Sequence, residues 1–251
     1  MAGQKIEYVK LDQAQVDAIC DRHERLWSGR SGGARASFAY SILEDLDLSN
    51  RDLSDADFSG AVLRGANLSG ATLNSAIFFV ADLRRASLEG ACLRRADLRG
   101  AIMRGANLTG ADMTEADLRE GAIAQVDKAK GLAILTHSTQ QSDAGKANFS
   151  GANLSRSKMA GITAQTADFT DAVLLGARMI RANLRGSSFH GANLEGADLS
   201  GADLTGVDFT DSVMIAGRYR RPQPRQPDRR PDRLACKMVR NRWPRGQALI
   251  V

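Results

Sequence analysis

The sequence predicts an all-β solenoid, in which the chain winds into a quadrilateral β-helix with four five-residue sides in each 20-residue coil. Two regularities carry this prediction. A large apolar residue recurs every five positions, at all 18 such positions from Phe38 to Ile123 and at 13 of 14 from Phe149 to Met214, where Ala164 is the exception. Seven of the eight phenylalanines occupy these positions and recur at a 20-residue interval within each run.

A period of five fits neither a helix, which repeats every 3.6 residues, nor a flat strand, which repeats every 2. Each unit must therefore combine a short extended side with a corner. In a unit such as Ala66–Gly70, extended backbone directs Ala66 and Leu68 inward and Asn67 outward. Glycine is frequent at the last place, where a corner favours a residue without a Cβ. Four such sides per coil would stack the phenylalanines directly above one another in the core.

The units resemble the A-[D/N]-L-x-x motif of the pentapeptide-repeat proteins, over residues 36 to 123 and 147 to 216. The resemblance implies a right-handed quadrilateral β-helix. A few residues depart from the inward alanine of the motif: Leu46 and Arg51 near the start, and Ile162 and Val207 later. We expect the coil to be distorted or covered there.

Five segments organise the chain: an N-terminal cap (1–35), a first repeat array (36–123), a register-breaking loop (124–146), a second array (147–216) and an Arg/Pro-rich tail (217–251). Within the cap, Ile6 to Val9 suits a short strand. Asp12 to Ser28 predicts a helix, because Asp12 and Gln15 form a capping box and Gly29 follows the end. We expect this helix to plug the open end of the coil, since solenoids need caps; the alternative is a partner-binding helix.

The break between the arrays predicts a protruding loop. Leu118 and Phe149 are 31 residues apart, which is one coil of 20 plus an excess of 11 if the phenylalanine stack is continuous. We therefore expect an 11-residue loop inside 125–145. Loops on rigid scaffolds often carry recognition, and loops matter in the gyrase-binding members of the family that the chain resembles. An inert insertion is the alternative.

The tail differs from the arrays in composition and charge. Residues 217–251 hold 11 Arg or Lys against 2 Asp, whereas the two arrays together have a net charge of −6 and the whole chain +5. The first part of the tail reads as a disordered linker, and Leu234 to Val251, with Met238 and Trp243, suits a weak C-terminal cap. A basic tail can contact nucleic acid, anionic lipid or the acidic rod itself; a merely solvated tail is the alternative.

Other classes of protein find little support. No stretch approaches the roughly 18 apolar residues of a transmembrane span, and the N-terminus lacks an apolar signal core. The three cysteines are scattered, which favours a reducing, cytoplasmic location. The three histidines, His23, His137 and His190, lack metal-ligand spacing, and no nucleotide-binding or hydrolase motif appears. We expect no enzymatic activity, catalytic residue, metal or cofactor.

With a continuous phenylalanine stack, the repeat assigns outward residues to two distinctive faces. An acidic face is predicted from Asp57, Asp97, Asp117, Asp168, Asp171, Asp208 and Asp211. The next face would combine arginines with exposed aliphatic residues, a composition typical of interfaces. Its predicted members are Arg64, Arg84, Arg85, Arg104, Ile42, Val62 and Ile102, continued in the second array by Val173, Leu175, Val213 and Ile215.

Two functions follow. The first is a scaffold whose Arg/aliphatic face binds a protein partner or a second copy of the chain. The second comes from the resemblance, because some pentapeptide-repeat proteins mimic B-DNA and bind DNA gyrase or topoisomerase IV, which they inhibit or protect from quinolones. A rod of about 40 Å would need roughly 23 negative charges to match B-DNA, far more than the net −6 of the arrays. The scaffold is therefore the first hypothesis and the DNA mimic the alternative.

Overall fold

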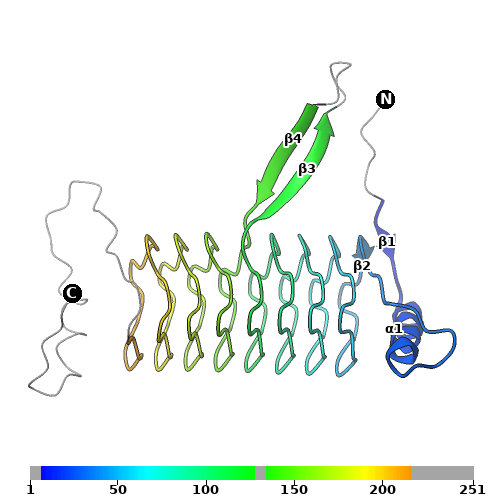
Figure 1. The fold of residues 1–251 in the computed structure, drawn as a ribbon, viewed down its shortest axis with the longest axis horizontal. Coiled ribbons are helices and arrows are strands. Elements are labelled where there is room, and N and C mark those ends of the chain that lie inside the picture. Colours follow the sequence, from blue (N-terminus) through cyan, green and yellow to red (C-terminus); the bar gives the residue numbers. More distant parts are fainter. Residues whose placement is uncertain (1–6, 128–133, 216–251) are drawn as a thin grey trace, which may run out of the picture.

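The chain forms a rod of stacked coils with a helix at one end and a hairpin on its side (Figure 1). The computed structural model describes residues 7–127 and 134–215. Its elements are strand β1 (Val9–Lys10), helix α1 (Gln13–Trp27), strand β2 (Ser41–Ile42) and the hairpin strands β3 (Gly121–Asp127) and β4 (Ile134–Gln140). The tail expected at 217–251 lies outside the described residues.

Successive coils of the rod are hydrogen-bonded to each other in a fixed register. Ser37 pairs with Asp57, and Asp57 with Ile77, in parallel bridges that recur along the rod. Around each bridge, the N–H of Phe38 donates to the Asp57 carbonyl (2.7 Å) and the N–H of Asp57 to the Ala36 carbonyl (3.1 Å). The predicted 20-residue coil with four sides is confirmed. Extended strands are almost absent from it, because each side is so short that only one residue forms a bridge.

The four sides are numbered here by the outward residues that stack in register. Side 1 carries Ser37, Asp57, Ile77, Asp97, Asp117, Lys158, Arg178 and Asp198. Side 2 carries Ile42, Val62, Asp82, Ile102, Asp143, Thr163, Asn183 and Asp203. Side 3 carries Asp47, Asn67, Ser87, Asn107, Asn148, Asp168, Ser188 and Asp208. Side 4 carries Asp52, Thr72, Cys92, Asp112, Asn153, Val173, Asn193 and Val213.

The corners are built from left-handed backbone and side-chain caps. At the corner after side 2, Gly65 has φ +67° and Arg85 has φ +57°, so the backbone demands this conformation even of a residue with a Cβ. Outward Asp and Asn residues hold the corner by accepting a hydrogen bond from the N–H two residues on, as Asn67 does from Ser69 (3.1 Å). This explains why the outward position of the repeat is so often Asp or Asn.

The phenylalanines form two stacks rather than one. Phe38, Phe58 and Phe78 stack on side 1 with ring centroids 4.9 and 4.7 Å apart. The second stack runs from Phe149 to Phe209 with centroids 4.6 to 5.4 Å apart. It lies on side 3, because Asn148 pairs with Asn107. The prediction of a continuous stack is therefore wrong.

The insertion between the arrays is also longer than predicted. Ile102 pairs with Asp143, whereas an uninterrupted coil would pair it with position 122, so a 21-residue insertion replaces the 11-residue loop that was expected. It is an antiparallel hairpin in which β3 pairs with β4 from Gly121↔Gln140 to Asp127↔Ile134. The coil therefore stops before Ile123 and resumes at Asp143, earlier than the boundary expected at 146–147. The error arose from aligning phenylalanine with phenylalanine, although leucine fills the same inward column equally well.

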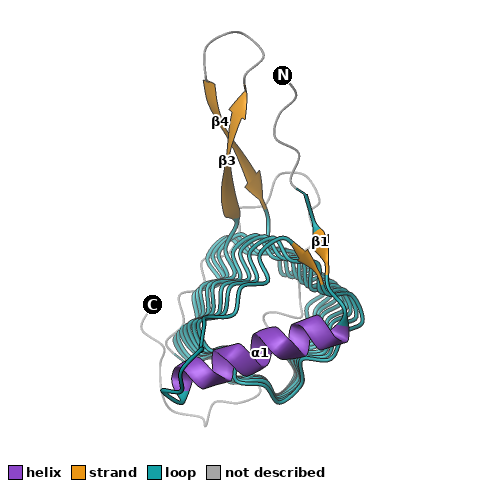
Figure 2. Ribbon diagram, turned by 90° about the vertical axis from the view of Figure 1, so that its right-hand side faces the viewer, coloured by secondary structure: helices purple, strands orange, loops and turns teal. Residues whose placement is uncertain are grey.

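Helix α1 lies across the N-terminal end of the coil (Figure 2). Asp12 caps it by accepting from the Gln15 N–H (2.9 Å), while the Gln15 side chain accepts from the Asp12 N–H (3.0 Å). Its residues Val16 and Cys20 are buried in the same core as the first coil. Of the strand expected at Ile6–Val9, Ile6 lies outside the described residues. Among the described residues, β1 covers Val9–Lys10, which pair in parallel with β2.

Side chains of the helix also satisfy the open backbone edge of the first coil. The amide of Gln13 accepts from the Asp47 N–H (2.9 Å) and donates to its carbonyl (2.7 Å), as a neighbouring strand would. His23 Nδ1 accepts from the Ala36 N–H (3.0 Å), and Nε2 donates to the Ser54 carbonyl (2.9 Å). Arg51, which replaces an inward alanine, contacts three carboxylates of α1. The coil is thus covered at this departure from the motif, as expected.

Candidate interaction surface on side 2

The structure brings all seven residues of the predicted interface together on side 2. Ile42, Val62 and Ile102 lie in its outward column, and Asp82 lies between Val62 and Ile102 in the same column. The arginines follow at the adjoining corner, one coil apart. We call this set the Arg/aliphatic surface: Ile42, Val62, Ile102, Arg64, Arg84, Arg85 and Arg104. The aliphatic side chains and Arg84 are half-buried, and the other three arginines are exposed.

Carboxylates lie between the arginines of this surface. Asp82 contacts Arg84 (2.6 Å) and Arg64 (2.7 Å). Glu44 lies 3.4 Å from Arg64, and Asp143 lies 3.6 Å from Arg104. Burial alone would raise the pKa of Asp82, but hydrogen bonds from Arg84 and Arg64 lower it overall. The repulsion expected of stacked like charges is therefore offset, and the guanidinium groups are held in place.

Of these carboxylates, the position of Asp82 could be predicted from the sequence, whereas that of Asp143 could not. Asp82 lies one coil from Val62 and one coil from Ile102, so the repeat alone places it in the column. Asp143 was hidden inside the predicted loop and became visible only through its pairing with Ile102. Arg85 differs from its neighbours, because among the described residues no carboxylate lies within 4.0 Å of it. It is the arginine of this surface most available to another molecule.

The hairpin rises next to this surface and is fixed at its base (Figure 1). Gln140, at the end of β4, donates to the Gly100 carbonyl (2.7 Å). The hydroxyl of Ser142 is buried, accepts from the Gly100 N–H (2.9 Å) and lies 2.7 Å from the Arg119 carbonyl oxygen. A Cβ at Gly121 would lie 3.1 Å from the Phe79 ring and from the Arg99 carbonyl, so only glycine fits without displacement. The chain then enters side 2 directly at Asp143.

The residues of the predicted acidic face do not share one face. Asp57, Asp97 and Asp117 lie on side 1, whereas Asp168 and Asp208 lie on side 3. The remaining two, Asp171 and Asp211, lie at the corner that follows side 3. The prediction placed them together because it assumed a continuous phenylalanine stack. For the same reason Val173 and Val213, expected beside the arginines, lie on side 4, with Leu175 and Ile215 at the corner that follows it.

Side 1 is also less acidic than predicted. Asp97 is paired with Arg99 (2.6 Å) and Asp117 with Arg119 (2.7 Å). Beyond Asp117 the same column continues with Lys158 and Arg178. The charge on this side therefore changes sign along the rod.

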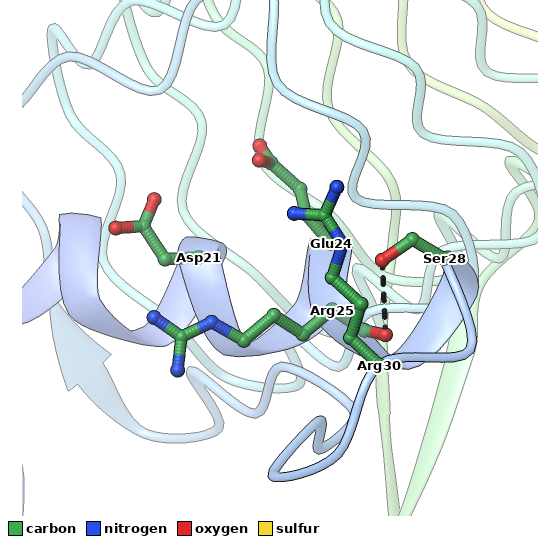
Figure 3. Close-up of a pocket in the computed structure, with 5 residues that line it drawn as sticks. All are labelled: Asp21, Glu24, Arg25, Ser28 and Arg30. Carbon is green, nitrogen blue, oxygen red and sulfur yellow. Dashed lines mark hydrogen bonds between the residues drawn. The ribbon is translucent and has the colours of Figure 1, made fainter.

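Concave sites are shallow in the part of the chain that the structure describes. One shallow pocket lies on α1 and the loop after it. It is lined by Asp21, Glu24, Arg25, Ser28 and Arg30 (Figure 3). It is polar and open to solvent, and two of its carboxylates already bind Arg51. Among the described residues, no group of three or more His, Cys, Asp or Glu side chains is arranged to hold a metal ion. The helix that the structure describes, α1, is too short and too polar to span a membrane.

Comparison with known proteins agrees with this architecture. The family model for pentapeptide repeats matches eight copies at residues 35–78, 81–119, 147–186 and 177–211, more than half of the chain. The chain belongs to the pentapeptide-repeat family. No curated protein matches it.

Several solved structures are similar to this pentapeptide-repeat chain. QnrB1, a plasmid-mediated fluoroquinolone resistance protein, is 20% identical in a trypsin-treated form, over 72% of this chain and 87% of that chain, with a TM-score of 0.46. HetL from Nostoc sp. strain PCC 7120, involved in heterocyst differentiation regulation, is 29% identical over 71% and 82% (TM-score 0.23). The protein alr5209 from Nostoc PCC 7120 is 34% identical over 45% and 83% (TM-score 0.36).

Proposed function

We propose that this pentapeptide-repeat protein is a non-enzymatic scaffold that binds a protein partner through the Arg/aliphatic surface of side 2. The observation that carries the proposal is the alternation of half-buried aliphatic side chains with arginines along one rigid side. Interfaces are enriched in arginine, and their fully buried core is more apolar than the rest of the protein surface. Cys20 and Cys92 are free thiols, which is consistent with a reducing, cytoplasmic location.

The rigidity of this surface favours binding. Each coil is bonded to the next by backbone hydrogen bonds of about the same length, such as Leu43 to Val62 (2.7 Å) and Leu63 to Asp82 (2.7 Å). The guanidinium groups of Arg64 and Arg84 are oriented by Asp82 before any partner arrives. Little side-chain entropy is then lost on binding. The matching partner surface would have an apolar centre and acidic residues around it.

The proposal can be tested with two variants that change the same charges on different sides. Val62→Lys with Arg85→Glu alters side 2, and Thr72→Lys with Arg95→Glu alters side 4. Arg85 and Arg95 are matched, because each is the second arginine of an Arg-Arg corner with φ near +57° and no carboxylate within 4.0 Å among the described residues. We expect partners captured from native lysate to be lost with the side 2 variant only. Equal capture by both variants, or equal loss, would refute the assignment.

Side 2 could also bind a second copy of the chain, and the same pair of variants separates this case. A homodimer would show twice the chain mass in light scattering without any lysate protein. It would revert to a monomer in the side 2 variant alone.

The alternative, a DNA mimic that binds a type II topoisomerase, has weaker support. Mimicry of B-DNA needs dense negative charge along one surface. Here the aspartates of the predicted acidic face are divided between side 1, side 3 and the corner after side 3, and Asp97 and Asp117 of side 1 are paired with arginines. DNA supercoiling by gyrase, measured with a large molar excess of this protein, should therefore be unaffected; inhibition at stoichiometric amounts would favour the alternative.

A further inference from the structure

The two ends of the rod are closed to different degrees. At the N-terminal end, Phe38, Leu43, Leu48 and Leu53 are fully buried beneath α1 and β1. At the C-terminal end, Leu199 is still buried, but the larger inward residues that follow it in the last coil are less covered. Leu204, Val207 and Phe209 are only partly buried, and Met214 is 42% exposed. An apolar cross-section of the core therefore faces outward at this end.

In the last coil, the backbone N–H groups of the residues whose side chains point inward also lack backbone partners in the part of the chain that the structure describes. One coil earlier, the N–H groups of Met179, Leu184 and Phe189 donate to the carbonyls of Asp198, Asp203 and Asp208 (2.7 to 3.0 Å). The equivalent N–H groups of Leu199, Leu204 and Phe209 make no backbone hydrogen bond within the described residues. Such an edge invites pairing with another segment.

The charge around this end has one sign. Residues 186–216 contain five acidic residues and no Lys or Arg: Glu195, Asp198, Asp203, Asp208 and Asp211. Hydrogen bonds from Thr205 and Thr210 lower the pKa values of Asp203 and Asp208. The segment that follows, 217–251, has 11 Arg or Lys against 2 Asp. An acidic rim is thus continuous in sequence with a strongly basic segment.

We propose that residues 217–251 of the same chain cover this open end. Between Asp232 and Pro244, helical spacing would place Leu234, Met238 and Val239 on one side and the basic residues Arg233, Lys237 and Arg240 on the other. This pattern is typical of an amphipathic helix with an N-cap and a proline stop. Its apolar side would cover Leu204, Phe209 and Met214, and its arginines would meet the acidic rim.

The length of the segment fits this arrangement. Residues 217–231 contain four of the five prolines of the chain, a composition typical of a semi-rigid spacer. Fifteen residues at about 3.1 Å each span up to roughly 45 Å, whereas one side of the coil is about 10 Å of extended chain. The spacer starts at the rim of the open end, just after Ile215. The effective concentration of the tethered segment at the open end is in the millimolar range, which favours binding within one chain over binding between copies.

Amide hydrogen exchange of the full chain tests the proposal. The N–H groups of Leu199, Leu204 and Phe209 should be protected, although no described residue bonds them. Removal of residues 218–251 should speed their exchange at least about tenfold, while the N–H of Leu108 in the middle of the rod stays unchanged. The same measurement on Leu108 shows that the shortened chain is folded.

A charge-reversal variant tests whether the acidic rim helps to bind the C-terminal segment, in addition to the burial of apolar residues. Asp208→Lys should speed exchange at Leu199 and Leu204 by about two- to fivefold. The matched control is Asp52→Lys at the opposite end. Both aspartates are exposed, and both accept from the N–H two residues on, at 2.8 Å for Asp208 and 3.1 Å for Asp52. Asp52→Lys should leave these amides unchanged.

Two outcomes would overturn the proposal. The first is rapid exchange of Leu199, Leu204 and Phe209 in the full chain, which would mean that nothing covers the end. The second is a dimer in light scattering whose edge protection disappears on dilution to a monomer. In that case a second copy, and not the chain's own C-terminal segment, would be the occupant.

Discussion

Replacement of Arg51 by methionine should loosen the N-terminal cap and leave the rest of the rod intact. The Arg51 side chain is only 27% exposed and lies 3.1 Å from Asp17, 3.0 Å from Asp21 and 3.1 Å from Glu24. Methionine retains the apolar stem and its packing while removing the charge. The variant therefore isolates the three ion pairs.

The size of the effect follows from these contacts. Partly exposed ion pairs contribute about 0.2–1 kcal/mol each, so three contribute roughly 1.5 kcal/mol. Without the cation, Asp17, Asp21 and Glu24 repel one another along the helix by about 0.2–0.5 kcal/mol per neighbouring pair. The total is about 2 kcal/mol, which corresponds to a roughly 30-fold increase in opening of the cap.

Amide exchange within α1 measures this opening, because solenoids lose stability locally. Val16 and Cys20 should exchange roughly 30-fold faster in Arg51→Met at low salt and less so at about 1 M salt, where charges are screened. Arg64→Met is the control. Arg64 is 50% exposed, and Asp82 retains its ion pair with Arg84 when Arg64 is replaced. This change should therefore have little effect on α1.

A second substitution tests the sign of the interaction. Asp21→Asn should destabilise the cap in the native background, where Asp21 binds Arg51, but stabilise it in the Arg51→Met background, where Asp21 is only repelled. The reasoning is refuted if Asp21→Asn has the same sign in both backgrounds. It is refuted equally if Arg64→Met loosens α1 as much as Arg51→Met.

Four further outcomes are expected. Burial raises the pKa of the Cys20 thiol to about 11, so thiol reagents at about pH 8 should label Cys92 in the native protein and leave Cys20 unmodified. The lowered pKa of Asp82 contributes stability above its ordinary value of 3.8 that is lost at lower pH; Asp82→Asn should therefore show a smaller fall in urea midpoint on acidification. Phe169→Ala should destabilise the protein by about 4 kcal/mol in urea unfolding, because this fully buried ring stacks on both neighbours at 4.8 and 4.6 Å. Deletion of residues 121–141 should leave a folded rod by circular dichroism, because it removes the 21 inserted residues and restores the 20-residue step after Ile102.

Much of the fold could be predicted from the sequence because burial in the coil is periodic. The inward or outward orientation of Leu68 or Asp82 depends only on position within the five-residue unit, and burial of the apolar residue fixes it. Arg51 was informative as well, because an arginine at an inward position predicted that the coil is distorted or covered there, and α1 covers it with three carboxylates. The helix itself was signalled by its capping box at Asp12 and Gln15.

The side to which the second array belongs could not be predicted in the same way. Leu118 and Phe149 are 31 residues apart, so the five-residue period allows insertions of 1, 6, 11, 16 or 21 residues. Each choice moves the second array by one side. The choice of 11 depended on phenylalanine stacking alone, but the inward columns accept Leu, Met and Phe alike, so stacking discriminates little between them.

This ambiguity decided how well each candidate surface was predicted. The residues of the Arg/aliphatic surface were placed on a common side correctly, because Ile42, Val62 and Ile102 all precede the insertion and their spacing there is fixed. The acidic face combined residues from both arrays and separated into sides 1 and 3 once Asp143 was found to pair with Ile102. In a repeat protein of this kind, a surface is predictable from sequence within an uninterrupted array. Across an insertion, one observed pairing between the arrays is needed before charges can be assigned to a common side.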